Sequence, residues 1–336
     1  MTQSETPVKV LYITGAGRSG STILDVVLGT HPNIESTGEL SNLVRNGWIG
    51  GGSLRGIERK RLRRPICTCG RRLDVPEVED AAEACPFWSS VRREWVERVD
   101  SRDDIESYPT LQDDFERFKR LPRLLRERRR PSPRFRLYAR LTRALFESIS
   151  VVSGKPVIVD STKVSARAFA LSMVPGIDLR AVHNVRDVRG VMSSRRKTSH
   201  KDLRAGIKGE DHEGHPAWRT AVWWAGKNVI AEWVCAQLGP GKAVRVRHED
   251  LYEDTRGVLG KIAPLIEVDL TGVADTASSG ETLAVGHNIG GNRAKKSGIV
   301  TLRPDAQEWR GALSAGEQRL TWALMGWLMR RYGYEK

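Results

Sequence analysis

A glycine-rich turn near the start of the chain constrains its fold more than any other feature. An apolar run at residues 8–13 leads into residues 15–22, which read GAGRSGST. A short apolar helical segment follows at residues 23–28, and Gly29 and Pro32 end it. A strand, a glycine-rich turn and a helix in immediate succession form the setting of a phosphate-binding loop. The start of the chain therefore predicts an anion site where a strand ends.

The loop has the G-x-x-x-x-G spacing of nucleoside triphosphatases but lacks their lysine. Ser21 stands where those enzymes carry the lysine that neutralises the β- and γ-phosphates during phosphoryl transfer. Arg18 instead places a permanently charged, forked donor inside the loop. An ordinary ATPase or kinase is therefore disfavoured.

Apolar runs farther along the chain alternate with helical segments. Strands are expected at residues 157–159, 179–185 and 244–246, and helices at 164–173, 188–196 and 218–236. This alternation favours a three-layer α/β fold of the P-loop type, with a central parallel sheet flanked by helices. We expect residues 1–336 to form a single domain. Residues 48–150 lack a convincing strand and are expected to form a basic, mainly helical insertion.

Two of the expected helices carry apolar residues at helical spacing, so we expect these residues to face the core. In the first helix they are Trp218, Val222, Ala225, Val229 and Trp233. In the last helix they are Leu320, Leu324, Trp327 and Leu328. Ser314, with Glu317 three residues later, predicts a capping box at the start of that last helix.

The chain has an excess of positive charge, much of it in the expected insertion. Lysine and arginine number 55 against 41 aspartate and glutamate residues, which gives a net charge of +14. Residues 117–143 contain twelve basic side chains and one acidic, and residues 59–72 contain seven basic and none acidic. Solvated helix faces, an anion-binding rim, a nucleic-acid surface and contact with an acidic membrane leaflet all fit this pattern. No zinc-finger, RRM or homeodomain pattern accompanies it, so nucleic acid is the weaker alternative.

A second anion site is expected at the end of a later strand. The strand at residues 179–185 delivers Arg186 to the carboxyl edge of the sheet, where ligands of such folds bind. Ser194 lies eight residues farther on, two turns along the next helix, so its hydroxyl could share the same phosphate. The alternative is a surface ion pair between Arg186 and Asp187. Two such sites suit a nucleotide that carries phosphates at both ends.

Together these motifs resemble the sulfotransferase superfamily, whose donor is 3′-phosphoadenosine-5′-phosphosulfate (PAPS). Residues 17–22 look like the family's 5′-phosphosulfate loop, and residues 185–194 look like its 3′-phosphate motif. Residues 247–251 are similar to the family's R-Y-E-D-L segment, with His248 in the tyrosine position. Residues 290–293 resemble a late loop that many bacterial members place near the donor. The resemblance covers the chain from about residue 8 to residue 332, apart from the insertion.

The resemblance implies an enzyme that moves a sulfuryl group from PAPS to an acceptor hydroxyl by in-line displacement, with no metal required. Arg18 would neutralise the leaving phosphate, where cytosolic members usually carry lysine. This departure is similar to the tyrosylprotein sulfotransferases and to some bacterial carbohydrate sulfotransferases. The residues expected to bind PAPS are Gly17, Arg18, Ser19, Gly20, Ser21, Thr22, Arg186, Ser194, Gly291, Asn292 and Arg293.

Glu39 is the expected general base of this reaction. It lies 21 residues after Arg18 and directly follows Gly38, a layout that looks like that of the tyrosylprotein sulfotransferases. A second strand would return its carboxylate to the sheet edge beside the loop, and Gly38 would permit a close approach of the chain. An exposed or helix-capping glutamate is the alternative. The rival bases are His183, His248 and His287, although a lone histidine is more often structural.

Lys163 is the third expected catalytic residue. It follows the strand expected at residues 157–159, after Asp160, Ser161 and Thr162. The resembling enzymes keep a lysine or serine near this strand end to steady the transferring sulfonate. A lysine in the first turn of an exposed helix is the equally weighted alternative.

Three cysteines, Cys67, Cys69 and Cys85, form a weaker constellation. Three thiols could bind zinc with a fourth ligand, but no histidine lies near them in sequence and C-x-C is not the usual zinc-knuckle spacing. We therefore expect no metal, and favour reduced thiols or a local disulfide. Similar cysteine clusters appear in bacterial relatives of the resembling family, which implies a local fold rather than a catalytic role.

Location and partners follow from weaker signals. No stretch approaches 18 consecutive apolar residues, and residues 1–9 lack a basic region followed by an apolar one. A cytoplasmic protein without a transmembrane segment is expected, with peripheral membrane contact left open and no nucleic-acid partner. The acceptor could be a carbohydrate, lipid, peptide or secondary metabolite. The alternative function is a non-catalytic or NTP-using P-loop protein that binds nucleotide or RNA through its basic insertion.

Overall fold

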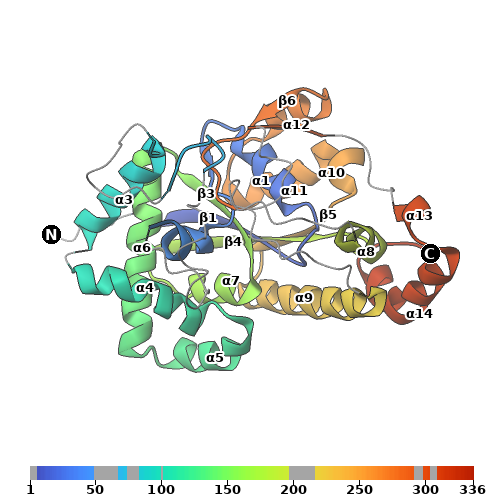
Figure 1. The fold of residues 1–336 in the computed structure, drawn as a ribbon, viewed down its shortest axis with the longest axis horizontal. Helices are drawn as coiled ribbons and strands as arrows, with labels where there is room; N and C mark the ends of the chain where they lie inside the picture. Colours follow the sequence, from blue (N-terminus) through green and yellow to red (C-terminus); the bar gives the residue numbers. More distant parts are fainter. Residues whose placement is uncertain are drawn as a thin grey trace.

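A parallel five-stranded sheet forms the centre of the protein (Figure 1). The computed structural model describes residues 6–48, 67–73, 83–99, 101–196, 216–290, 298–302 and 309–336. The strand order is β2-β3-β1-β4-β5, and every neighbouring pair is parallel. The strands are β1 (Val8–Thr14), β2 (Ile34–Ser36), β3 (Val157–Lys163), β4 (Ile177–Val185) and β5 (Ala243–Arg247). The predicted α/β fold with a parallel sheet is therefore confirmed, and β1 lies in the middle of the sheet.

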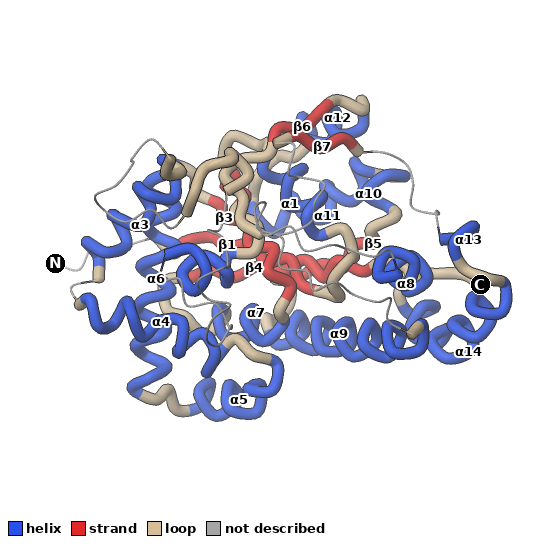
Figure 2. The backbone as a smooth tube through the Cα atoms, viewed as in Figure 1, coloured by secondary structure: helices blue, strands red, loops and turns tan. Residues whose placement is uncertain are grey.

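Helices cover both faces of this sheet (Figure 2). On one face lie α1 (Ser21–Gly29), α10 (Asp250–Glu253), α11 (Thr255–Ile266) and α12 (Thr271–Ser278). On the other lie α3 (Pro86–Arg98), α4 (Arg102–Phe115), α5 (Leu121–Arg129), α6 (Pro133–Ser153), α7 (Ser165–Leu171) and α9 (Ala217–Gln237). The remaining elements are η1 (Leu40–Asn42), η2 (Leu43–Trp48), η3 (Phe118–Arg120), α8 (Val188–Arg196), β6 (Thr282–Ala284), β7 (Ile299–Thr301), α13 (Trp309–Ala312) and α14 (Ala315–Arg331).

The central strand supplies both hydrophobic cores through the alternation of its side chains. Val10 and Tyr12 pack in the cluster on the α6 and α7 side, whereas Leu11 and Ile13 pack in the cluster on the α1 and α11 side. All four side chains are completely buried. Successive residues of a strand point to opposite faces, so a continuous apolar run is what a strand covered on both faces requires.

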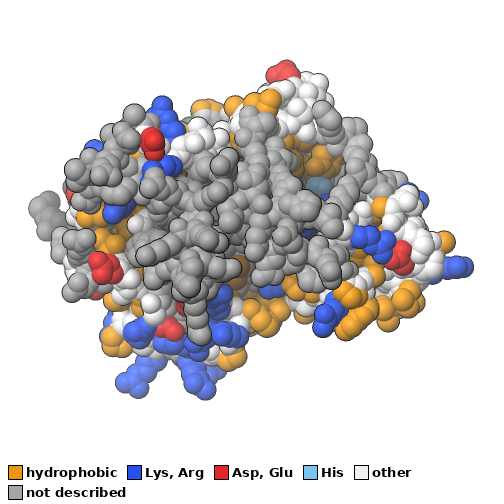
Figure 3. Space-filling view, viewed as in Figure 1, with side chains coloured by type: hydrophobic (Ala, Val, Ile, Leu, Met, Phe, Trp, Pro, Cys, Tyr) orange, Lys and Arg blue, Asp and Glu red, His pale blue; other side chains and the backbone are white. Residues whose placement is uncertain are grey.

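Helices α9 and α14 turn different faces to the core than the sequence predicts. Trp218, Val222 and Val229 on α9 are exposed, and the buried side chains include Trp224. On α14, only Leu328 of the predicted stripe is buried. Figure 3 shows hydrophobic side chains on the surface where these two helices lie. Apolar residues occur on most sides of α9, so their spacing did not determine which side packs inward.

The capping box at the start of α14 is confirmed. The Ser314 side chain accepts from the Glu317 backbone N–H, and the Glu317 carboxylate accepts from the Ser314 backbone N–H over 2.9 Å. These two bonds satisfy backbone and side-chain groups that the first turn of a helix otherwise leaves unpaired.

The described part of the expected insertion is mainly helical, and ion pairs account for several of its arginines. The acidic partners lie on neighbouring turns or helices, and the pairs are Arg117–Asp113, Arg123–Asp114, Arg134–Asp114, Arg140–Asp104 and Arg143–Glu147. Figure 3 shows other basic side chains gathered at the edge of the molecule around α5. The ion pairs fit the interpretation of this stretch as solvated helix faces. None of the helices in the described ranges is long and apolar enough to cross a membrane.

Candidate functional site

The glycine-rich turn connects the central strand to α1. β1 ends at Thr14 and α1 begins at Ser21, and Gly20 between them has a left-handed φ of 77°. A Cβ atom at Gly20 would lie 2.0 Å from Nδ1 of His248, so glycine is required here on two grounds. The first turn of α1 carries no acidic residue. The turn therefore presents the N-terminal backbone of a helix, an arrangement that favours an anion.

Two predicted phosphate-binding segments meet at this turn. Arg18 donates from Nε to Oγ of Ser194 over 3.0 Å and from Nη2 to the Ser194 carbonyl over 3.3 Å. Arg186 follows β4 and donates from Nη1 to the Arg18 carbonyl over 3.1 Å. Three residues that the sequence singles out, 168 and 176 positions apart, thus lie in one site.

Arg186 is not neutralised by its neighbour in sequence. The Asp187 carboxylate instead forms an ion pair with Arg189 over 2.7 Å. Within the part of the chain that the structure describes, no carboxylate lies in ion-pair contact with Arg186, and its Nε is buried without a hydrogen-bond partner. The alternative of a surface pair between Arg186 and Asp187 is therefore wrong.

Buried polar atoms without partners gather beside the turn. Among the described residues they include Oγ of Ser19, Nε of Arg186 and Nδ1 of His248. Burial and the nearby Arg186 charge lower the pKa of His248 to about 3, so its ring is neutral. Buried polar groups are nearly always hydrogen-bonded in folded proteins, so a group of unpaired ones beside an anion-binding turn suits a polar ligand.

The sequence analysis missed Trp223, which packs against the turn from α9. A Cβ atom at Gly17 would lie 3.3 Å from the Trp223 ring, so this glycine lets the indole approach the loop backbone. The Arg195 guanidinium lies 4.3 Å from the centre of the same ring. The predicted spacing of apolar residues on α9 skipped position 223, so periodicity gave no signal for it.

Glu39 and Lys163 meet at the same edge of the sheet. Lys163 is the last residue of β3, and the strand register places it opposite Thr14 at the end of β1. Nζ of Lys163 lies 2.6 Å from Oε1 of Glu39, and Asn42 donates from Nδ2 to Oε2 over 3.1 Å. The two side chains of the pair are 18% and 24% exposed, so the pair is partly open to solvent. Two of the predicted catalytic residues, 124 positions apart, are therefore in contact.

A segment from late in the chain holds the backbone around Glu39. Gly38 has a φ of 76°, and a Cβ atom there would lie 2.3 Å from the carbonyl oxygen of Ile289. The Glu39 N–H donates to that carbonyl over 2.7 Å, and the Ile289 N–H donates to the Thr37 carbonyl over 2.9 Å. The backbone position of the predicted base thus depends on a glycine and on the segment that contains Ile289.

Asp25 ties the helix after the glycine-rich turn to the strands beside it. Its carboxylate is completely buried and accepts from Ser36 Oγ over 2.9 Å and from Ser161 Oγ over 3.1 Å. Ser36 belongs to β2 and Ser161 to β3. One buried carboxylate therefore fixes α1, β2 and β3 relative to one another. The turn precedes α1, Glu39 follows β2 and Lys163 ends β3, so these contacts also hold the turn and the Glu39–Lys163 pair in place.

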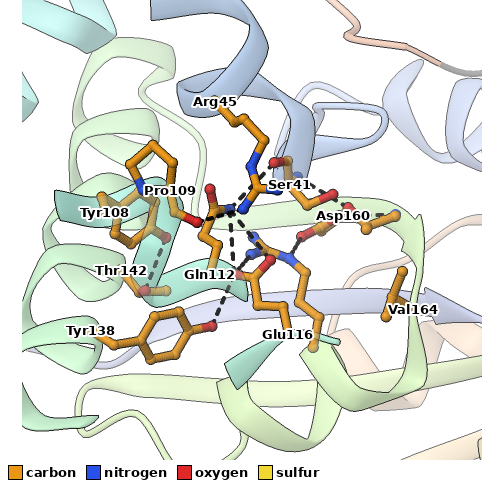
Figure 4. Close-up of polar contacts among 12 residues, drawn as sticks. Ser41, Arg45, Tyr108, Pro109, Gln112, Glu116, Tyr138, Thr142, Asp160 and Val164 are labelled. Atoms are coloured by element: carbon orange, nitrogen blue, oxygen red, sulfur yellow. Dashed lines mark hydrogen bonds and ion pairs between the residues drawn. The ribbon is translucent and has the colours of Figure 1, made fainter. Parts of the chain in front are cut away.

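A buried charged network lies behind the end of β3 (Figure 4). Arg167 is completely buried, donates from Nε to Oδ2 of Asp160 over 2.9 Å, and also pairs with Glu116. Thr162 donates its N–H to Asp160 over 3.0 Å, and its hydroxyl accepts from the Ser41 N–H over 3.2 Å. The network therefore joins the strand that ends in the predicted lysine to the segment that follows the predicted base. The sequence analysis missed these positioning residues.

The three rival histidines are less suited to act as the base. Burial lowers the pKa of His183 to about 4, and its Nε2 lies 3.1 Å from Oδ1 of Asn228. Burial likewise lowers the pKa of His248 to about 3. Nδ1 of His287 lies 3.3 Å from Sγ of Cys85. His183 and His248 are weak bases, and Nδ1 of His287 faces a cysteine thiol. Glu39 is therefore the better candidate for the base.

The late loop expected near the donor is only partly described. Gly291, Asn292 and Arg293 lie outside the described residues. Gly290 lies beside the predicted base, because a Cβ atom there would be 3.2 Å from Oε2 of Glu39. The described end of this loop is therefore next to the site.

The structure shows an α/β protein with a glycine-rich turn and a Glu39–Lys163 ion pair at one edge of its sheet, and the comparisons place it in a family. A model of the sulfotransferase family matches residues 11–272, so the chain belongs to the sulfotransferase family. The sulfotransferase domain from the Synechococcus PCC 7002 olefin synthase is 18% identical, with 100% of this chain and 98% of that chain covered and a TM-score of 0.50. This likeness supports the same fold.

The chain was also compared with a second solved structure and with curated proteins. The sulfotransferase domain from the curacin biosynthetic pathway is 15% identical, with 96% of this chain and 99% of that chain covered and a TM-score of 0.47. Among curated proteins, none matches this chain.

Proposed function

We propose that the protein transfers a sulfuryl group from PAPS to an acceptor hydroxyl by in-line displacement. Membership of the sulfotransferase family supports sulfuryl transfer. The observation that carries the choice of donor is the convergence of Arg18, Arg186 and Ser194 at the glycine-rich turn. One phosphate-binding turn serves many nucleotides, whereas a second arginine and hydroxyl beside it suit a donor with a further phosphate on its ribose.

Each part of the donor has a proposed binding segment. Residues 17–22 would hold the 5′-phosphosulfate through the loop backbone and the N-terminus of α1. Arg186 and Ser194 would hold the 3′-phosphate, since both the guanidinium and the hydroxyl donate hydrogen bonds. Arg18 bonds to Ser194 in this structure, so donor binding would exchange that contact for contacts to phosphate. Residues 291–293 of the late loop would complete the donor-binding site.

The chemical step would proceed by attack of the acceptor oxygen on sulfur. The new oxygen–sulfur bond forms as the bond between sulfur and the 5′-phosphate oxygen breaks, and that oxygen keeps the electron pair. Arg18 would neutralise the developing charge, which leaves adenosine 3′,5′-bisphosphate as the second product. The acceptor proton would pass to the Glu39 carboxylate.

Lys163 would act beside the base. Its ammonium group holds the Glu39 carboxylate at 2.6 Å, and its place opposite Thr14 is next to the start of the glycine-rich turn. A cation there could also steady the transferring sulfonate as it moves from donor to acceptor. The acceptor hydroxyl would belong to a carbohydrate, lipid, peptide or secondary metabolite.

A turnover assay with labelled donor tests this function. The protein is incubated with PAPS labelled in its sulfuryl group and with pools of hydroxyl acceptors from each of these four classes. We expect labelled product together with adenosine 3′,5′-bisphosphate in at least one pool. Turnover of ATP with magnesium, without any transfer from PAPS, would instead support an NTP-using protein.

A further inference from the structure

Three thiols and one imidazole converge at a point that the proposed reaction does not use. They belong to Cys67, Cys69, Cys85 and His287, and their ligand atoms all lie within 4.8 Å of one another. Nδ1 of His287 lies 3.3 Å from Sγ of Cys85 and 3.7 Å from Sγ of Cys67. In tetrahedral zinc sites the bonds are about 2.3 Å to sulfur and about 2.0 Å to nitrogen, which separates sulfur from nitrogen by about 3.5 Å. The observed spacing therefore fits four ligands around one ion.

The backbone around the cysteines forms a compact unit. The Cys67 N–H donates to the Arg71 carbonyl and the Gly70 N–H donates to the Cys67 carbonyl, both over 2.9 Å. Gly70 has a φ of 80°, which closes this turn. The Cys85 N–H donates to the Arg72 carbonyl over 2.9 Å, so the residue that carries the third thiol is bonded to the segment that leaves the turn. Cys85 immediately precedes α3, which fixes it further.

The histidine is brought in by a segment about 200 residues later. The Phe87 ring stacks on the His287 ring at 5.2 Å with an interplanar angle of 11°, and Trp88 donates from Nε1 to the His287 carbonyl over 2.7 Å. The Thr68 N–H donates to the Asn288 carbonyl over 3.2 Å, and the Asn288 N–H donates to Thr68 Oγ1 over 2.9 Å. The imidazole is thus held against the thiols from two sides.

We propose that Cys67, Cys69, Cys85 and His287 bind a structural Zn²⁺ ion. Thiolate sulfur and imidazole nitrogen in tetrahedral spacing are the donors that zinc prefers, and four protein ligands leave no open position for catalysis. All four cysteines of the chain are free thiols, and a disulfide would use only two of the three in this cluster. This proposal replaces the expectation of a metal-free protein, because folding supplies the histidine that the local sequence lacks.

The ion would also position the proposed base. Ile289 lies two residues after His287, and its carbonyl accepts the Glu39 N–H over 2.7 Å. Ile289 also forms the bridge to Gly38. Zinc would therefore clamp the segment against which the base is held. This second role rests on the proposed function, whereas zinc binding itself does not.

Metal content is the direct test. The full chain is purified under reducing conditions, freed of metal with a chelator, loaded with Zn²⁺ or Co²⁺ and passed through a desalting column. We expect about one Zn²⁺ per chain by mass spectrometry of the metal. Bound Co²⁺ should show thiolate charge-transfer absorption and the intense d–d bands of tetrahedral cobalt. Failure to retain either ion would overturn the proposal.

Cysteine variants show whether the ion occupies this cluster. Cys85→Ser should lower retained Zn²⁺ at least tenfold, whereas Cys235→Ser should retain it, because Cys235 lies on α9 outside the cluster. Cys69→Ser serves as a second test, since Cys69 is exposed and its loss spares the core. Unchanged zinc content in both cluster variants would contradict the assignment.

The positioning role has its own readout. Removing zinc should lower kcat at least tenfold, a larger change than in the Kd of adenosine 3′,5′-bisphosphate, because Ile289 contacts the backbone of the base directly, whereas residues 291–293, which follow the clamped segment, are only one part of the proposed donor site. A kcat that is unchanged in verified zinc-free protein would contradict that role. If the protein binds zinc but does not turn over PAPS, the proposed metal site is supported and the proposed function is contradicted.

Discussion

Replacing Glu39 with glutamine tests the proposed base with little disturbance of the fold. Glu39→Gln keeps the shape of the side chain, and its amide oxygen can still accept from Lys163, which now lies 2.6 Å from the carboxylate. The ion pair is partly exposed, and pairs of this kind contribute about 0–1 kcal/mol to the free energy of unfolding. The variant should therefore fold, and its thermal midpoint should stay within a few degrees of wild type.

The effect on the chemical step should be much larger. A positioned general base contributes about 10²- to 10⁴-fold to a rate, which corresponds to about 3–5 kcal/mol of the activation barrier. A rapid-quench single-turnover experiment, with enzyme in excess over labelled PAPS, measures this step directly. The Kd of adenosine 3′,5′-bisphosphate should remain within about twofold of wild type, because the glutamate faces the acceptor.

Glu35→Gln provides the matched control. Glu35 lies on β2 and forms an ion pair with Lys155 over 2.9 Å. Lys155 precedes the start of β3, whereas Lys163 is the last residue of that strand. Both variants therefore remove one charge from a glutamate–lysine pair. Only Glu39→Gln should lose single-turnover rate. A near wild-type rate for Glu39→Gln, or equal losses in the two variants, would refute the assignment of the base.

Three further predictions follow from contacts at the turn and from buried histidines. Arg186→Ala should weaken the binding of adenosine 3′,5′-bisphosphate by about 2–4 kcal/mol in isothermal titration, which raises its Kd roughly 30- to 1,000-fold. An equal loss of binding free energy for adenosine 5′-monophosphate would show that Arg186 is structural. Gly20→Ala should lower the free energy of unfolding in urea by at least about 1–3 kcal/mol, since it combines a left-handed backbone with a clash against His248, and an unchanged midpoint would contradict this. The pKa values of His183 and His248 are lowered to about 4 and about 3, below an unfolded value of about 6.5, so the unfolded chain binds more protons in acid. Stability should therefore fall as the pH drops from about 6.5 toward 4, by about 1.4 kcal/mol per pH unit for each histidine, and flat urea midpoints across this range would contradict the prediction.

The parallel sheet, and the meeting of the glycine-rich turn with Arg186 at its edge, could be predicted because short-range patterns determine them. The apolar runs that end at Ile13, at Val185 and near Val246 coincide with strands, and parallel strands bring their carboxyl ends to one edge. The glycine-rich turn and Arg186 therefore lie together, as local spacing implied. Lys163 meets Glu39 for the same reason, since β2 and β3 are neighbours in the sheet.

Features that depend on packing between distant segments could not be predicted. The prediction of which face of α9 packs inward was wrong because apolar residues occur on most sides of that helix. Only the elements packed against it determine which side is buried. The buried Arg167–Asp160 pair was missed because charged residues are rarely placed in a core by sequence reasoning. His287 joins Cys85 across 202 positions, and no local spacing encodes such a contact.

The choice of nucleotide tests the central proposal most directly. Isothermal titration compares adenosine 3′,5′-bisphosphate with ATP in the presence of magnesium, using the same preparation and ionic strength. We predict that the bisphosphate binds at least about 100-fold more tightly, because Arg186 and Ser194 have a 3′-phosphate to bind only in that ligand. ATP that binds as tightly as the bisphosphate, or more tightly, would rule out the proposed donor site.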